Sequence, residues 1–150
     1  ADLVRKRLMS VRMRLYATEA YLNQAGELGS IEDIGGHRLI CQSPHAFQVA
    51  AGATLVQHLL SYDTPKLLHV NNYFGVLQAV LSDLGIGVLP DYVTEDSPRL
   101  IRVLPEIESG EVPVFLAYPE ELRQSKRVMA FRDFVQEEII AHRRKIRDGG

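Results

Sequence analysis

Apolar and polar residues recur along this 150-residue chain with two different periods, and their alternation predicts an α/β fold. Between residues 3 and 17, apolar and mostly basic side chains alternate with period two near the end of the segment, which is typical of a half-exposed strand. One side of that pattern holds Val11, Met13 and Leu15, and the other holds Arg12, Arg14 and Tyr16.

The best amphipathic helix is predicted at residues 72–84, where apolar residues recur three and four positions apart. Either Asn71 or Asn72 is expected to cap its start, and Gly85 is expected to end it in the left-handed conformation. The apolar stripe of this helix is expected to consist of Phe74, Leu77, Val80, Leu81 and Leu84.

Shorter patterns predict the other elements. Residues 46–60 are ambiguous: a helix at 53–60 is favoured, and a hairpin about Gly52 is the alternative. The strands beside the main helix should be parallel, because a helix connects them. Strands are predicted at 39–41, 66–70, 86–89, 100–104 and 114–118, and helical segments at 19–24 (capped by Thr18), 31–34 and 126–142 (capped by Ser125), the last with Val128, Phe131, Val135 and Ile139 on one face.

The amino-acid composition sets only broad limits on the class of protein. Apolar residues make up 46% and charged residues 24% of the chain, as in an ordinary soluble globular protein. A net charge of −2 gives no general reason to bind nucleic acid, and the apolar runs are short for a membrane span. The single cysteine excludes an internal disulfide, so the cytoplasm is the expected compartment. The chain also starts in mid-pattern, which predicts a piece of a larger protein.

Two predicted strand ends carry candidate ligand-binding residues. Asn71 and Asn72 follow the strand at 66–70, where a helix N-terminus presents free N–H groups and a partial positive charge. Their amides could donate to a ligand carboxylate or carbonyl, and simple helix capping is an equal alternative. Ser43 and His45 follow the strand at 39–41, where an ordinary surface histidine is the simpler interpretation. Tyr73 could line a small pocket, whereas Phe74 fits the core stripe better.

Signatures of catalysis and metal binding are missing from the sequence. It has no G-x-S-x-G, P-loop or H-E-x-x-H motif, and its five histidines form no i, i+4 pair on one helix. Gly85 and Gly87 follow a helix and precede a strand, the reverse of a dinucleotide-binding turn. Cys41 is expected to be a buried, inert thiol rather than a redox sensor. We therefore predict no catalytic residue, metal or cofactor.

Four segments together resemble the C-terminal effector-binding domain of LysR-type bacterial transcription regulators. Their order and spacing match that family over essentially the whole chain. The segment with GIGVLPDY and the one with YPEELRQSKRVMAFRDF are the most specific. The four segments are LYATEAYLNQAGE with IEDIGGHRLI, VNNYFGVLQAVLSDLGIGVLPDY, LIRVLPE, and VFLAYPEELRQSKRVMAFRDFVQEEI.

The resemblance implies a periplasmic-binding-protein-like α/β fold, in which two subdomains are joined by crossover strands. The first subdomain would be incomplete here, without the family's opening strands and helices. The implied division is residues 1–15 and 100–145 for the partial first subdomain, 16–92 for the second, 93–99 for a crossover loop and 146–150 for a tail.

The resemblance also implies a function. The domain would bind a small, neutral or anionic effector between the subdomains, through Ser43, His45, Asn71, Asn72 and Tyr73 on the half that is present. DNA would be bound only through a missing N-terminal helix-turn-helix domain, and the truncated fragment is expected to form a homo-oligomer. The alternatives are a stand-alone small-molecule (amino-acid or carboxylate) binding module without DNA function and, with less support, a small α/β enzyme.

Overall fold

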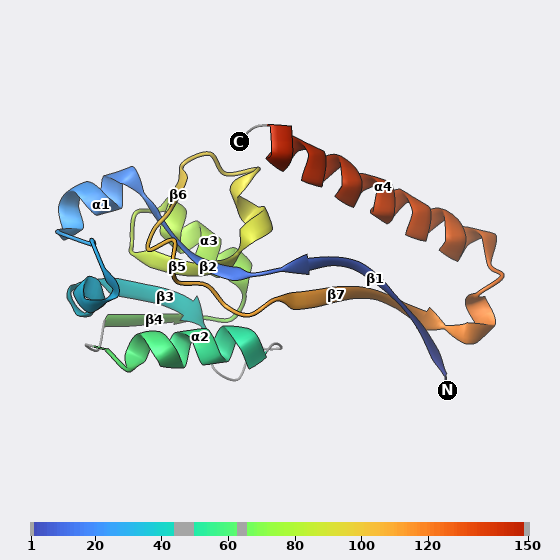
Figure 1. Ribbon diagram of the computed structural model, residues 1–150, viewed down its shortest axis with the longest axis horizontal. Helices are drawn as coiled ribbons and strands as arrows, with labels where there is room; N and C mark the ends of the chain where they lie inside the picture. The colour runs from blue at the N-terminus through green and yellow to red at the C-terminus, as the bar shows by residue number, and fades with distance from the viewer. Residues whose placement is uncertain (1, 44–49, 63–65, 149–150) are drawn as a thin grey trace. The chain divides into compact units, whose positions relative to one another are not determined.

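The chain divides into two compact units (Figure 1). The computed structural model describes residues 2–43, 50–62 and 66–148, without the side chains of residues 50, 51 and 145–148. The smaller unit combines both ends of the chain, Ala1–Val11 and Pro113–Gly150, and the larger unit is Arg12–Val112. The subdomain boundaries implied by the resemblance stay a prediction.

The larger unit contains a five-stranded sheet. Its strands are β2 (Met13–Thr18), β3 (Arg38–Gln42), β4 (Lys66–Val70), β5 (Ile86–Pro90) and β6 (Leu100–Arg102). Their spatial order is β4-β3-β5-β2-β6. β3 pairs in parallel with β4 and β5, whereas β2 pairs antiparallel with β5 and β6. The strands on either side of the main helix are therefore parallel as predicted, with β3 inserted between them.

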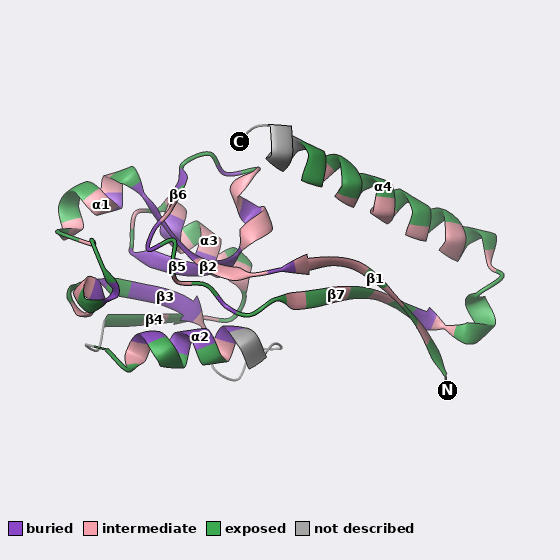
Figure 2. Cartoon of the chain, viewed as in Figure 1, coloured by how far each residue is buried: buried purple, intermediate pink, exposed green. Residues whose placement is uncertain are grey.

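Helical segments cover both faces of this sheet. They are α1 (Glu19–Ala25), the 3-10 helix η1 (Ile31–Gly36), α2 (Ala50–Leu60), α3 (Tyr73–Leu81) and the 3-10 helix η3 (Asp91–Thr94). The first face carries α1, η1 and α2, packed on Leu15, Ala17, Leu39, Cys41, Ile86 and Val88. The second face carries α3, packed on Tyr16, Ile40, Leu89 and Leu100. The architecture is a three-layer α/β/α sandwich, and the buried strand positions concentrate in β2, β3 and β5 (Figure 2).

Several predicted elements are confirmed. The Thr18 hydroxyl accepts a hydrogen bond from the N–H of Tyr21 at 3.2 Å and so caps α1. Of the ambiguous segment 46–60, residues 50–60 form α2, so the helix interpretation is confirmed and the hairpin about Gly52 is wrong. Residues 46–49 lie outside the described part of the chain.

The buried stripe of α3 agrees with the prediction at Val80 but not at Phe74 or at Leu84, which lies beyond the end of the helix and is 40% exposed. Val76 and Val80 are fully buried, whereas Phe74, expected in the core, is 63% exposed. The reason lies in β5: a Cβ on Gly87 would come within 2.3 Å of the Val80 side chain and 3.1 Å of the Val76 side chain. Because Gly87 lets the helix approach the sheet here, these two valines turn inward and Phe74 turns outward.

Gly85 does not have the expected left-handed conformation. The helix ends at Leu81, and the positive φ, 62°, is taken by Asp83. Asp83 accepts a hydrogen bond from the Thr18 hydroxyl at 2.5 Å, which holds it in place. Glycine is required at position 85 for a different reason: a Cβ there would lie 2.5 Å from the carbonyl oxygen of Arg38.

The prediction of a half-exposed strand is only partly correct for residues 13–18. Tyr16 was expected on the exposed side, but it is 2% exposed, because α3 covers the second face of the sheet as well. Burial raises the pKa of the Tyr16 hydroxyl. β6 also ends earlier than predicted, at Arg102, before Leu104 takes a positive φ of 47°.

The smaller unit is a two-stranded sheet with a long helix. Its elements are β1 (Leu3–Val11), β7 (Val112–Pro119), the 3-10 helix η4 (Glu120–Leu122) and α4 (Lys126–Asp148). The Ser125 hydroxyl accepts a hydrogen bond from the N–H of Val128 at 3.4 Å, which confirms the predicted cap. The helix then runs beyond its predicted end at residue 142 and takes up part of the expected tail.

Helix α4 buries its apolar face only in part (Figure 2). Val128, Val135 and Ile139 are half-buried, but Phe131, predicted on the same face, is 57% exposed. None of the helices in the described residues has the length and apolar character that crossing a bilayer requires.

Candidate functional site

Four of the five predicted binding residues lie at one edge of the five-stranded sheet, where β3, β4 and β5 all end; we call it the carboxyl edge. They are Ser43, Asn71, Asn72 and Tyr73. Gln42 and Val70 are register partners at the ends of β3 and β4. Ser43, the first residue after β3, donates its backbone N–H to the carbonyl of Val70 at 2.9 Å. The structure thus brings Ser43 beside Asn71, as the two strand ends predicted. His45 lies outside the described residues.

Asn72, and not Asn71, caps helix α3. Its side-chain oxygen accepts a hydrogen bond from the N–H of Gly75 at 2.9 Å, and its carbonyl accepts one from Val76 at 3.2 Å. Asn71 is exposed beside it, and no hydrogen bond of its side chain is seen in the described structure. The amide group of Asn71 and the amino end of α3 are therefore both available to a ligand.

Tyr73 is part of an aromatic group at the carboxyl edge. Its ring stacks on Phe74 with the centroids 5.0 Å apart. Tyr92, in η3 directly after β5, is half-buried against the second-face core and shares a hydrogen bond with Tyr73. Burial, this hydrogen bond and the nearby Asp91 charge raise the pKa of Tyr92. The residue was missed because nothing in the sequence near it indicates proximity to Tyr73.

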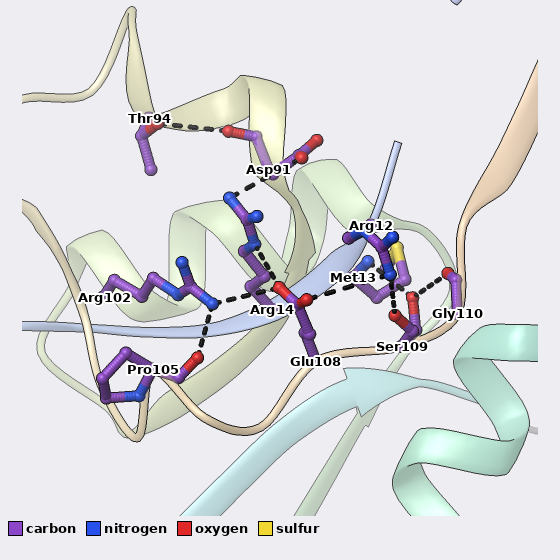
Figure 3. A network of polar contacts seen from close by, with 10 residues as sticks. All are labelled: Arg12, Met13, Arg14, Asp91, Thr94, Arg102, Pro105, Glu108, Ser109 and Gly110. Carbon is purple, nitrogen blue, oxygen red and sulfur yellow. Dashed lines mark hydrogen bonds and ion pairs between the residues drawn. The ribbon is translucent and has the colours of Figure 1, made fainter. Parts of the chain in front are cut away.

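A network of charged residues continues along the same edge (Figure 3). The Glu108 carboxylate accepts hydrogen bonds from Arg14 at 3.0 Å and Arg102 at 3.1 Å, and Arg12 lies 3.8 Å away. Arg14 also reaches Asp91 at 3.7 Å. The hydrogen bond from Arg14 and the charges of the three arginines lower the pKa of Glu108. Sequence reasoning missed this network because Arg12 and Arg14 lie more than ninety residues from Glu108 along the chain.

Ser109 fixes the backbone beneath that network (Figure 3). Its hydroxyl accepts a hydrogen bond from the N–H of Met13 at 2.8 Å and donates to the carbonyl of Gly110 at 2.7 Å. Its own N–H donates to the carbonyl of Met13 at 2.9 Å. Ser109 is 5% exposed, so these bonds are shielded from water. They hold the first residues of β2 against the segment that leads out of the larger unit.

The opposite edge of the sheet, where β3 and β4 begin, is the amino edge. It contains an open hollow of about 280 Å³, lined by Tyr21, Gln24, Ala25, Gly36, His37, Arg38, Lys66, Asp83 and Leu84. His37 is buried, and both its ring nitrogens have partners: the Tyr21 hydroxyl at 2.8 Å and the carbonyl of Glu27 at 2.9 Å. No predicted binding residue lies there.

Cys41 lies in the centre of the sheet. It is fully buried, and burial raises the pKa of its thiol to about 11. Its sulfur is 3.7 Å from Nδ1 of His69 on the neighbouring strand. The thiol is therefore protonated and shielded near neutral pH, as the buried interpretation expected. Within the described residues, no group of three His, Cys, Asp or Glu side chains could hold a metal ion.

Comparisons with known proteins agree on one protein family. Residues 1–139 match the LysR substrate binding domain. The chain is 28% identical over 128 residues to the uncharacterized HTH-type transcriptional regulator YhjC of Escherichia coli K12, covering 79% of this chain and 42% of that protein. It thus spans less than half the length of this curated relative.

Solved structures show the same fold. The regulatory domain of CrgA, a LysR-type transcriptional regulator from Neisseria meningitidis, has a TM-score of 0.73 at 23% identity, covering 91% of this chain and 69% of that one. The regulatory domain of AphB from Vibrio vulnificus has a TM-score of 0.63 at 21% identity, covering 90% and 69%. The chain therefore belongs to the LysR substrate-binding domain family and is a ligand-sensing regulatory domain.

Proposed function

We propose that this domain senses its effector at the carboxyl edge, through Ser43, Asn71, Asn72 and Tyr73. The observation that carries the proposal is the meeting of two strand ends with the amino end of α3, a place where open α/β sheets bind ligands. The Asn71 amide and the free N–H groups of the first turn supply donors. Tyr73 and Tyr92 supply an apolar wall.

The wider function follows from the family. We propose that the native protein is a DNA-binding transcription regulator, whose DNA contacts lie in a helix-turn-helix domain upstream of this chain. The protein would then act in the cytoplasm and assemble as a homo-oligomer on DNA. Effector binding would shift the population between two arrangements of that assembly. No catalytic step is proposed for any described residue. Similarity to transcription regulators favours this role over a stand-alone binding module.

Asn71 provides the most direct test of the site. A library of small metabolites would be screened against the wild-type chain by the shift of backbone amide NMR signals of residues 71–73. For a molecule that binds, we expect Asn71→Ala to weaken affinity about ten-fold, the cost of a lost hydrogen bond to a polar ligand group. Stability should not change, because Asn71 is exposed.

A control variant at the other edge sharpens that test. Gln24→Ala removes an amide side chain from the hollow at the amino edge, and it should leave affinity unchanged. If ligands instead shift signals around Gln24 and Lys66, or if Asn71→Ala binds as tightly as wild type, the proposed site is wrong.

A further inference from the structure

The charged network and the start of α3 lie on the same face of the sheet. Successive side chains of a strand point to opposite faces. Met13 packs against the first-face core, whereas Tyr16 packs in the second-face core with α3. Arg12 and Arg14 therefore face the side that carries α3, and their shared contact with Glu108 agrees with this.

The two groups also lie in one row across the sheet. Arg12 accepts a backbone hydrogen bond from Asp91, the first residue after β5, at 2.9 Å. Arg14 lies opposite Leu89 of β5. The register of Ile40 with Gly87, continued by two residues, puts Leu89 level with Gln42, which lies opposite Val70 of β4. Arg12 and Asn72 each lie two residues beyond this row, toward the carboxyl edge. Three strand spacings separate Arg12 from Asn72, or about 14 Å between backbones. In the structure the Arg12 guanidinium lies at Ser109 and Glu108, on the side of β2 away from β5. If it leaves them and extends over β5, the side chain together with a small molecule spans that distance.

Positive charge exceeds negative charge along this row. In the network, Arg12, Arg14 and Arg102 are balanced only by Glu108 and Asp91. The amino end of α3 adds a partial positive charge equivalent to about half an elementary charge. The row is thus electropositive on a chain whose net charge is −2.

Of the three arginines in the network, Arg12 has the guanidinium most available to a ligand. Arg14 and Arg102 contact Glu108 at 3.0 and 3.1 Å, but Arg12 lies 3.8 Å away. The Arg12 side chain is also 40% exposed, more than those of Arg14 and Arg102. Its remaining bond is a single donation to the carbonyl of Ser109 at 3.2 Å.

We infer that Arg12 determines specificity for an anionic effector, pairing with a carboxylate or similar anion while the rest of the molecule lies against Asn71–Tyr73. This inference rests on the proposed effector site and names its ligand class. Glu108 acts as the internal competitor that holds Arg12 in the unliganded protein. An anion that draws Arg12 away loosens one contact of the Glu108 network, beside the point where the chain leaves the larger unit.

The test uses two probes of the same shape and different charge, benzoate and benzamide. Each would be titrated into the 150-residue chain and followed by the NMR signals of the Arg12 Nε–H group and the amides of residues 71–73. We expect benzoate to bind about five-fold more tightly than benzamide, because only benzoate pairs with the guanidinium. In Arg12→Gln the ratio of the two affinities, benzoate to benzamide, should fall to about one. In Arg12→Lys most of the preference for benzoate should remain.

Glu108→Gln gives a result that a purely structural role would not produce. Removing the competing carboxylate should raise benzoate affinity about three-fold and leave benzamide affinity unchanged. The matched control is Arg99→Gln, because Arg99 pairs with Asp83 at 3.3 Å but lies away from the row. Arg99→Gln should keep the wild-type preference for benzoate over benzamide. The midpoint of urea unfolding would verify that each variant folds.

The outcomes separate the inference from the proposed site. If both probes shift the signals of residues 71–73 with equal affinity, or if Arg12→Gln keeps the preference for benzoate, the inference is wrong and the proposed site stands. If neither probe shifts those signals at millimolar concentration, both the site and the inference are wrong.

Discussion

Both edges of the five-stranded sheet carry positively charged side chains, but the helix ends at the two edges have opposite partial charges. At the amino edge, Arg38 and Lys66 line a hollow together with residues from the carboxyl ends of α1 and α3. Helix carboxyl ends are partially negative, so these cations offset a charge that the fold already supplies. At the carboxyl edge, Arg12 and its neighbours share an edge with the amino end of α3, and the positive charges add.

The two edges therefore differ in how much of their positive charge is compensated within the protein. The hollow at the amino edge is lined by the cations Arg38 and Lys66, by the carboxylate Asp83 and by residues at helix carboxyl ends, so its charges largely compensate one another. The carboxyl edge has uncompensated charge and free N–H groups. Ligand binding needs groups that are not already satisfied within the protein, and these gather at the carboxyl edge.

The largest expected effect concerns the backbone contact at the amino edge. Gly85→Ala places a Cβ 2.5 Å from the carbonyl oxygen of Arg38, and backbone has little freedom to move. We expect the free energy of unfolding to fall by about 3 kcal/mol, measured by urea denaturation. Gly36→Ala, also at this edge, has no atom within 4 Å of the new Cβ and should change stability by less than about 0.5 kcal/mol. Equal effects would contradict the close-contact argument.

A smaller effect is expected at the carboxyl edge, where Asn72 combines capping with proposed binding. Asn72→Ala should lower the free energy of unfolding by about 1 kcal/mol, because the N–H of Gly75 loses its acceptor. Asn72→Ser keeps an acceptor oxygen and should restore most of that stability. If the two variants are equally stable, the Asn72 side chain does not cap α3.

The cations at the amino edge should contribute still less. Arg38→Gln is expected to lower the free energy of unfolding by about 0.5 kcal/mol at low salt, because it removes a positive charge near helix carboxyl ends. The loss should shrink in high salt, which screens exposed charges. Arg12→Gln should show a smaller loss, because it removes only an exposed charge contact with Glu108 at 3.8 Å. Unfolding curves at two salt concentrations test this contrast.

The smallest effect is a pH dependence at the carboxyl edge. The pKa of Glu108 is lowered from its ordinary 4.5, first by the hydrogen bond from Arg14. The folded state thus favours the charged carboxylate, and the stabilisation is present above pH 4.5 and lost as pH falls through the lowered pKa. Glu108→Gln should therefore be slightly less stable than wild type at pH 6, with the difference vanishing in acid. A difference that grows on acidification would contradict the sign of the shift.

The hydrophobic periodicity of the sequence was sufficient to predict most of the helices and strands. The strand at 66–70, the helix at its end, the Thr18 cap and the Ser125 cap were all predictable, because period and capping are local properties. The position of Asn71 and Ser43 beside one another also followed, since parallel strands end at the same edge.

Errors arose where another part of the chain decides the outcome. Phe74 faces solvent because Gly87, on β5, admits Val76 beside the correctly predicted Val80. Tyr16 is buried because α3 covers its face of the sheet. Gly85 is needed by a carbonyl on β3 and not by the end of its own helix.

The sequence by itself determined the α/β pattern, the family and the two strand ends that form the candidate site. Only the tertiary structure revealed the charged network that we propose as part of that site. Arg12, Arg14 and Glu108 come together because β2 and the segment before β7 are bonded side by side at Ser109. Periodicity reports which face of an element is buried, but it carries no information about contacts between residues that the fold alone brings together.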